Sequence, residues 1–159
     1  MIREIIELVV ITFLPLLELR ASIPYGILKL KMGWPEVFII CVIANILLGI
    51  LVYFLLDKLV HLVIRIKPIG RLYKRIVIKT QSKVRPYVER YGEIGVALFI
   101  GVPLPGSGVY TGALGSYLLG LGYKKFTIAC IIGVIIAGVA VTIISLFGAG
   151  AYGFFLKMI

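Results

Sequence analysis

The chain has 159 residues, of which 61% are hydrophobic and 15% are charged. Soluble domains are usually about 45–50% apolar and about 25% charged, so this composition argues against a water-soluble globular protein. The formal net charge is +10, which alone fits binding to nucleic acid or to anionic lipid. We therefore expect an all-α integral membrane protein that forms a single membrane domain over residues 1–159.

The first apolar stretch stops before it is long enough to cross a membrane. Residues 5–14 are apolar apart from Glu7 and Thr12, and a helix-hostile break from Leu14 to Pro24 follows. Ten helical residues rise about 15 Å, half of the roughly 30 Å of hydrocarbon. We therefore predict that residues 2–31 enter the membrane and return to the same side as a re-entrant helical hairpin. The alternative makes residues 2–24, and residues 94–121 later in the chain, ordinary spanning helices kinked at proline.

An acid and a base, Glu18 and Arg20, stand two residues apart in this break. Charges within a bilayer cost about 2.5–3.5 kcal/mol each on insertion scales, and they usually pair or face a cavity. On extended backbone both side chains would point to the same side, which favours pairing. Two interpretations stay open. The pair is a structural lock on the hairpin tip, or Glu18 takes up a proton or cation while Arg20 holds an anionic group.

An uninterrupted apolar stretch from Val37 to Leu56 predicts a transmembrane helix over residues 36–60. Asn45 is its strongly polar residue at mid-membrane depth. It either bonds an unsatisfied carbonyl of a hairpin tip or lines a pathway. Two cysteines and one histidine, spread along the chain, do not suggest a metal site, and we expect no metal and no cofactor.

The centre of the chain is basic, with ten of the 17 Lys and Arg residues in positions 58–90. The positive-inside rule places residues 62–90 in the cytoplasm of a multi-pass plasma-membrane protein, with the N- and C-termini outside. Apolar residues recur at spacings of three or four between the basic ones, which predicts an amphipathic helix on the membrane surface. No nucleic-acid module is recognisable, so Arg71, Lys74 and Arg75 are expected to contact lipid headgroups.

A second break, over residues 101–108, interrupts the next apolar stretch, so residues 93–121 predict a second re-entrant hairpin. Prolines withhold backbone donors and glycines loosen the chain, which exposes amides around Ser107 before a helix that begins near Val109. Free amides at a helix N-terminus attract anions, although re-entrant geometry without a ligand explains the break equally well. The candidate site residues of this hairpin are Pro103, Pro105, Gly106, Ser107, Thr111 and Gly112.

The two halves of the chain resemble each other. A shift of 89 residues without a gap superposes Glu4 on Glu93, Gly26 on Gly115, Cys41 on Cys130 and Gly49 on Gly138. Duplication explains this, with repeat 1 over residues 1–61 and repeat 2 over residues 91–159, the latter ending in a transmembrane helix over residues 125–147. Each repeat would contain one hairpin and one crossing. An odd number of crossings gives the repeats opposite orientations, which is an inverted repeat.

Both breaks carry recognisable motifs. Glu-Leu-Arg-Ala-Ser-Ile-Pro at residues 18–24 and Pro-Leu-Pro-Gly-Ser-Gly-Val-Tyr-Thr-Gly at residues 103–112 resemble the small multidrug export protein family over nearly the whole chain. More distantly, the chain is similar to the DedA superfamily, whose members have two facing re-entrant hairpins and are implicated in moving lipids. Unlike longer DedA proteins, its second break has no arginine comparable to Arg20. The resemblance implies roles for Glu18, Arg20, Pro24, Pro103, Pro105, Gly106 and Gly112.

These features predict a small transporter that moves an amphipathic small molecule or lipid through a midplane site between opposed hairpins. Ion or proton coupling is an option, and we expect a homodimer surrounded by membrane lipids. The alternative is a membrane-shaping or assembly protein that acts through its basic amphipathic segment. The sequence contains no Ser-His, paired-Asp or His-Glu-x-x-His arrangement, so we expect neither an enzyme nor a catalytic residue.

Overall fold

The computed structural model describes residues 2–15, 17–64, 91–103 and 107–157, and for residues 61–64 and 149–157 it describes the backbone alone. Every regular element in these ranges is a helix, as predicted. Most of the basic segment, with Arg71, Lys74 and Arg75, lies outside the described residues, and so do Pro105 and Gly106. The helices are α1 (Ile2–Phe13), α2 (Glu18–Pro24), the π-helix η1 (Tyr25–Lys29), α3 (Trp34–Ile64), the unlabelled helix Tyr91–Gly101 (helix 91–101 below), α6 (Val109–Leu119) and α7 (Tyr123–Lys157).

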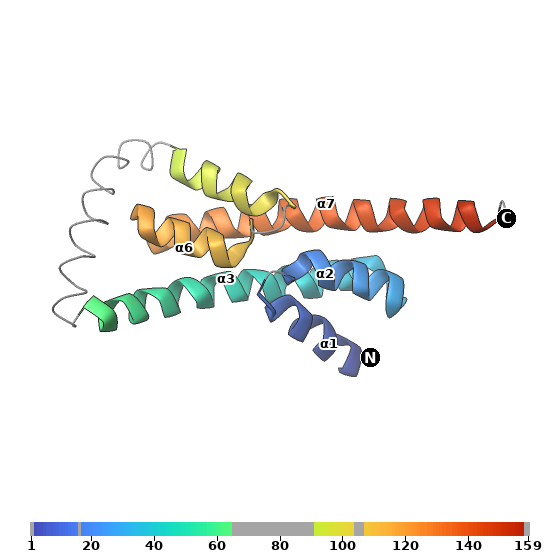
Figure 1. The fold of residues 1–159 in the computed structure, drawn as a ribbon, viewed down its shortest axis with the longest axis horizontal. Coiled ribbons are helices and arrows are strands. Elements are labelled where there is room, and N and C mark those ends of the chain that lie inside the picture. The colour runs from blue at the N-terminus through green and yellow to red at the C-terminus, as the bar shows by residue number, and fades with distance from the viewer. Residues whose placement is uncertain (1, 16, 65–90, 104–106, 158–159) are drawn as a thin grey trace.

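Within the described ranges, α3 and α7 are the helices long enough to cross a membrane. Their apolar spans are Trp34–Val60, of 27 residues, and Tyr123–Gly148, of 26 residues. At 1.5 Å per residue, each span exceeds the roughly 30 Å of hydrocarbon. The predicted spanning segments 36–60 and 125–147 therefore lie inside observed helices. The two helices pack against each other and run in opposite directions (Figure 1).

One face of α3 is apolar and uncovered. Ile39, Ile43, Leu47 and Leu51 recur every four residues, and each is 45–57% exposed. Soluble monomers rarely present a continuous apolar surface of this kind to water. Hydrocarbon removes the cost of exposing these side chains, so this face fits a membrane protein.

The other helices form two pairs, each of which turns back at one of the sequence breaks. α1 meets α2 at the first break, and helix 91–101 meets α6 at the second. In Figure 1 the open ends of the two pairs face opposite ends of the long axis, while both turns lie near its middle. α2 and α6 each pack against both α3 and α7. The two breaks are thereby brought together inside the molecule.

The first break is shorter than the sequence predicts. We expected non-helical backbone over residues 14–24, but α1 ends at Phe13 and α2 already begins at Glu18. Arg20 therefore lies on a helix and not on extended backbone. The chain reverses between α1 and α2, and Pro15 in this turn is the residue that disfavours a continuous helix.

Pro24 is accommodated at the end of α2 by a change of helix type. Proline has no N–H to donate, which normally kinks or ends a helix. Here the chain continues as η1, whose wider turns pair each N–H with a carbonyl five residues earlier. The N–H of Leu30, for example, donates to the Tyr25 carbonyl at 3.1 Å. The second helix of the pair therefore extends through Pro24 to Lys29.

The 89-residue offset also relates the helix bounds. α3 begins at Trp34 and α7 begins at Tyr123, 89 residues later. The first helices of the two pairs end at Phe13 and Gly101, which are 88 residues apart. At these two points the positions of the helix ends therefore agree, to within one residue, with the offset that relates the two halves of the sequence.

Glycine at position 133 permits close contact between α7 and helix 91–101. A Cβ at Gly133 would lie 2.7 Å from the Ala97 carbonyl oxygen and 2.8 Å from the Ile100 Cβ. Overpacking that moves backbone costs about 1–3 kcal/mol. We therefore expect Gly133→Ala to lower the free energy of unfolding in detergent by about that amount, as measured by thermal denaturation. Gly148→Ala is the control, because a Cβ there meets nothing within 4 Å. Equal losses in both variants would contradict this role of Gly133.

Candidate functional site

Glu18 is buried where the two breaks meet. Its side chain is 4% exposed, and its φ of 47° is uncommon for a residue other than glycine. The carboxylate Oε2 accepts a hydrogen bond from the Val109 backbone N–H at 3.1 Å. Val109 is the first residue of α6, where unpaired N–H groups and the helix dipole favour a negative charge. Glu18 therefore caps a helix that belongs to the other pair.

Gly108, just before α6, makes room for this carboxylate. A Cβ at this position would overlap the carboxylate oxygens of Glu18. The Gly108 N–H donates to the Thr111 hydroxyl oxygen at 3.0 Å, and the Thr111 hydroxyl donates to the Gly108 carbonyl at 3.2 Å. The start of α6 is thus satisfied partly by its own threonine and partly by Glu18.

Arg20 makes the complementary contacts at the end of helix 91–101. Its Nη2 donates to the Ser107 carbonyl, to the Ser107 hydroxyl at 3.1 Å and to the Val102 carbonyl at 3.2 Å. The Ser107 hydroxyl also donates to the Val102 carbonyl, at 2.6 Å. The last carbonyls of a helix lack partners and carry partial negative charge, so a guanidinium is favoured there. Arg20 Nη1 also lies 4.0 Å from Glu18 Oε2, so the two charges face each other.

A further contact runs from the second pair to the first. The Tyr110 hydroxyl donates to the carbonyl of Phe13, the last residue of α1, at 2.6 Å. The sequence patterns predict a flexible backbone at Gly108 but not its contact with Glu18, and they assign no contact to Tyr110. The sequence feature that could have predicted a contact of Tyr110 is its position in the first turn of a predicted helix. A tyrosine hydroxyl among apolar groups usually needs a hydrogen-bond partner. Together, these contacts hold the two turns against each other.

The contacts of Glu18 and Arg20 are reciprocal under the 89-residue offset. Position 18 corresponds to Ser107, and position 20 corresponds to Val109. Glu18 binds Val109, and Arg20 binds Ser107. Exchanging the two halves of the chain converts one contact into the other. Two-fold symmetric interfaces have this pattern, in which residue i meets j and residue j meets i.

The remaining predicted site residues lie at or near this junction in different ways. Pro24 ends α2, and Pro103 is an exposed, non-helical residue of the second break. Gly112 is buried, and a Cβ there would lie 2.7 Å from Ile100 Cγ1, so it permits packing within its own helix pair. The junction itself is formed by Glu18, Arg20, Ser107 and Thr111 from the predicted set.

Asn45 lies on α3, one helical turn from the junction. A Cβ at Gly49, four residues along, would lie 2.6 Å from Cys130 Sγ and 3.2 Å from Val109 Cβ. Asn45 is 1% exposed, and its Oδ1 accepts no hydrogen bond from the described residues. A buried acceptor without a donor costs about 1–3 kcal/mol. The amide oxygen of Asn45 is therefore a buried acceptor near the turns that no described residue satisfies.

Groups of the chain itself already occupy the amides at the start of α6 and the guanidinium of Arg20. The amides of the second break, which the sequence presents as an anion site, include the amide that binds the Glu18 carboxylate. Any anionic ligand at this helix start has to compete with Glu18, and any ligand of Arg20 has to compete with the backbone carbonyls of Ile100, Val102 and Ser107. Among the residues that the structure describes, no group of three or more His, Cys, Asp or Glu could hold a metal ion.

The two charges should be strongly coupled in stability. Arg20→Met leaves Glu18 buried beside an apolar side chain, and breaking a buried pair costs about 3–5 kcal/mol. The double variant Glu18→Gln/Arg20→Met removes both charges and keeps an amide oxygen that can accept from Val109. We expect it to unfold at a higher temperature in detergent than Arg20→Met alone, with the coupling measured by a double-mutant cycle. Simple additivity of the two single losses would show that the charges act independently.

Comparison with known proteins assigns the chain to a family. Residues 18–140, which are 123 of the 159 residues, match the family model described as "Putative small multi-drug export protein". The matched region includes the first break from Glu18 onward, the whole second break and both charged residues of the junction, Glu18 and Arg20. Searches of curated proteins and of solved structures gave no significant match. Because the family match covers most of the chain, this protein belongs to the small multi-drug export protein family.

Proposed function

We propose that this protein is a small membrane transporter that moves an amphipathic small molecule or lipid through the junction of its two breaks. The observation that carries the proposal is the reciprocal capping by Glu18 and Arg20. It places an acid and a base within an apolar helical core and connects both to the other half of the chain. Intramembrane charges of this kind commonly mark substrate or ion pathways. The export function in the family's description supports the same class of activity.

In this proposal the two helix pairs are re-entrant hairpins of an inverted repeat, and α3 and α7 span the membrane. α1 has 12 residues and α6 has 11, so they rise only about 18 Å and 16 Å and are too short to cross hydrocarbon. The reversal between α1 and α2 in Figure 1 argues against a single kinked spanning helix. Irregular backbone at this depth requires cover by protein or water, and each turn receives capping contacts from the other.

The capping contacts suggest how binding opens the junction. Protonation of Glu18 removes the negative charge from the start of α6, which weakens its attraction to the helix dipole. An anionic group of a substrate competes with Glu18 and the backbone carbonyls for Arg20. Both events weaken contacts that join the turns, and a ligand that prefers the parted state shifts the population toward it. Coupling to a proton or cation follows if Glu18 is the group that binds it.

Transport by reconstituted vesicles tests this site. A charge-assisted hydrogen bond contributes about 1.5–3 kcal/mol, so we expect Glu18→Gln and Arg20→Lys to reduce initial rates by roughly 10- to 100-fold. The rates to be measured are those of ethidium and of a fluorescent phospholipid, with and without a pH gradient. Glu93→Gln is the matched control, because Glu93 is an exposed carboxylate that pairs with Lys125 at 3.6 Å. If both junction variants move both probes at the parental rate, the junction is not the transport site.

Cysteine labelling tests the inverted topology. Glu36 lies in the first turn of α3, Lys124 lies in the first turn of α7, and both are exposed. The native cysteines, Cys41 and Cys130, are buried and should give little background. We expect a membrane-impermeant maleimide to label Glu36→Cys in intact cells and Lys124→Cys only after permeabilisation. Labelling of both variants from the same side would contradict the opposite orientation of the repeats.

A further inference from the structure

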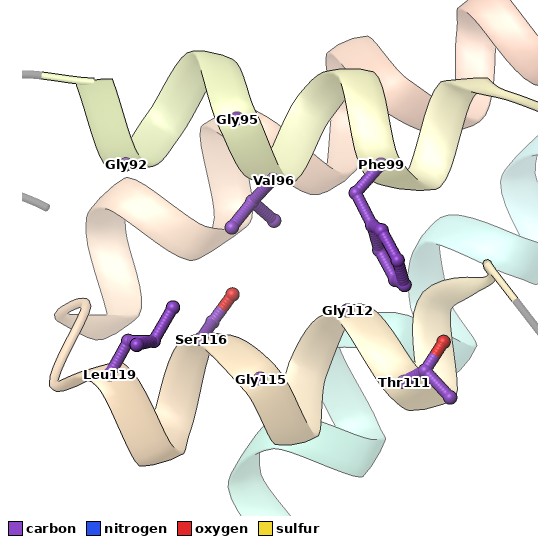
Figure 2. A pocket seen from close by; sticks show the side chains of 9 residues that line it. All are labelled: Gly92, Gly95, Val96, Phe99, Thr111, Gly112, Gly115, Ser116 and Leu119. Atoms are coloured by element: carbon purple, nitrogen blue, oxygen red, sulfur yellow. The ribbon is translucent and has the colours of Figure 1, made fainter.

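A groove lies between helix 91–101 and α6, beside the junction. Its volume is about 340 Å³, and its walls are largely apolar. In Figure 2, Val96 and Phe99 point from one helix toward the other, and Leu119 and Thr111 mark opposite ends of the α6 wall. Thr111 is also the residue whose hydroxyl caps Gly108. Thr111 therefore belongs both to the junction and to the wall of the groove.

Glycines keep this groove open. Gly95 on one wall and Gly115 on the other have no atom within 4 Å of where a Cβ would stand, so neither is required for helix packing. Gly112 differs, because a Cβ there would lie 2.7 Å from Ile100. Space at Gly95 and Gly115 is thus left unused by the described protein, while glycine costs helix stability relative to alanine.

A polar group without a partner points into the groove. Ser116 is fully buried, and its hydroxyl oxygen has no hydrogen-bond partner among the described residues. Figure 2 shows this hydroxyl directed from α6 toward Val96, into the space between the two helices. A buried hydroxyl without a partner is unfavourable, so a ligand that bonds to it gains affinity.

We propose that this groove binds the apolar body of an amphipathic small molecule, which hydrogen-bonds Ser116 through a hydroxyl or carbonyl group. Its volume lies near the lower end of small-molecule pockets, which are about 300–1,000 Å³. The unsatisfied hydroxyl of Ser116 favours an occupant with a hydrogen-bonding group over a lipid acyl chain, which carries no donor or acceptor along its hydrocarbon. That the bound molecule is then transported rests on the proposed function. Its binding in the groove does not depend on transport.

Photolabelling in vesicles of phosphatidylethanolamine and phosphatidylglycerol tests this binding. The probes are an eight-carbon alcohol that carries a diazirine and the matching hydrocarbon without the hydroxyl. Mass spectrometry should find saturable labelling of residues 92–99 and 111–119 in the parent protein. Gly115→Leu fills the groove and should reduce labelling by both probes at least tenfold. Ser116→Ala should weaken only the alcohol, by about 3- to 10-fold, the value of one hydrogen bond.

Gly148→Leu is the matched control, because Gly148 is an exposed glycine of α7 with open space around it. It should leave both labelling patterns unchanged. Non-saturable labelling that is no stronger in the groove than on the exposed face of α3 would overturn the proposal, since lipid chains would then account for it. Unchanged labelling of Gly115→Leu would also overturn it. Loss of transport in the Glu18 variant with groove labelling intact supports both proposals and shows that binding in the groove does not need transport. Absence of groove labelling in a protein whose transport depends on Glu18 rejects the groove proposal and leaves the transport proposal standing.

Discussion

Helix ends that are buried away from water must find hydrogen-bond partners, and this structure depends on how that requirement is met. Each break leaves backbone N–H or C=O groups without partners inside a helix, and Glu18, Ser107 and Val109 at the two breaks are all buried. Glu18 supplies the acceptor at the start of α6, and Arg20 supplies the donor near the end of helix 91–101. Each charge lies at the helix end whose dipole favours its sign. The contacts of Glu18 and Arg20 therefore both stabilise the helix ends at the breaks and hold the two halves of the chain together.

The junction divides its chemistry unequally between the two helix pairs. The first pair contributes both charges, and the second contributes backbone and the Ser107 hydroxyl from the positions that the 89-residue offset relates to them. If both pairs carried Glu and Arg, four charged groups would lose their hydration in one small buried space, at a cost of several kcal/mol per ion. A single pair with backbone partners avoids half of that cost. The unusual backbone of Glu18, with φ of 47°, is held by these same contacts.

Much of the fold follows from sequence, and the site follows only in part. Apolar length predicts α3 and α7, and proline and glycine mark both breaks, because these are local properties of the chain. The start of α2 at Glu18 was not predicted, since its helical conformation depends on contacts with Val109 and Ser107 about 90 residues away. The role of Gly108 is likewise a consequence of tertiary contact. The groove at Gly115 and Ser116 is a space between helices, which no pattern of side chains within one helix encodes.

Thr111 connects the two places where a ligand would act. The Thr111 hydroxyl accepts a hydrogen bond from the N–H of Gly108, and Gly108 faces the Glu18 carboxylate. Thr111 also lines the groove. A molecule seated against Thr111 restricts the rotamers that this side chain can adopt, and only some rotamers preserve the cap. Loss of that cap would leave the start of α6 more dependent on Glu18. In such an arrangement, the apolar part of a substrate in the groove and a charge or proton at Glu18 would act on the same helix end, which gives a physical route for coupling them.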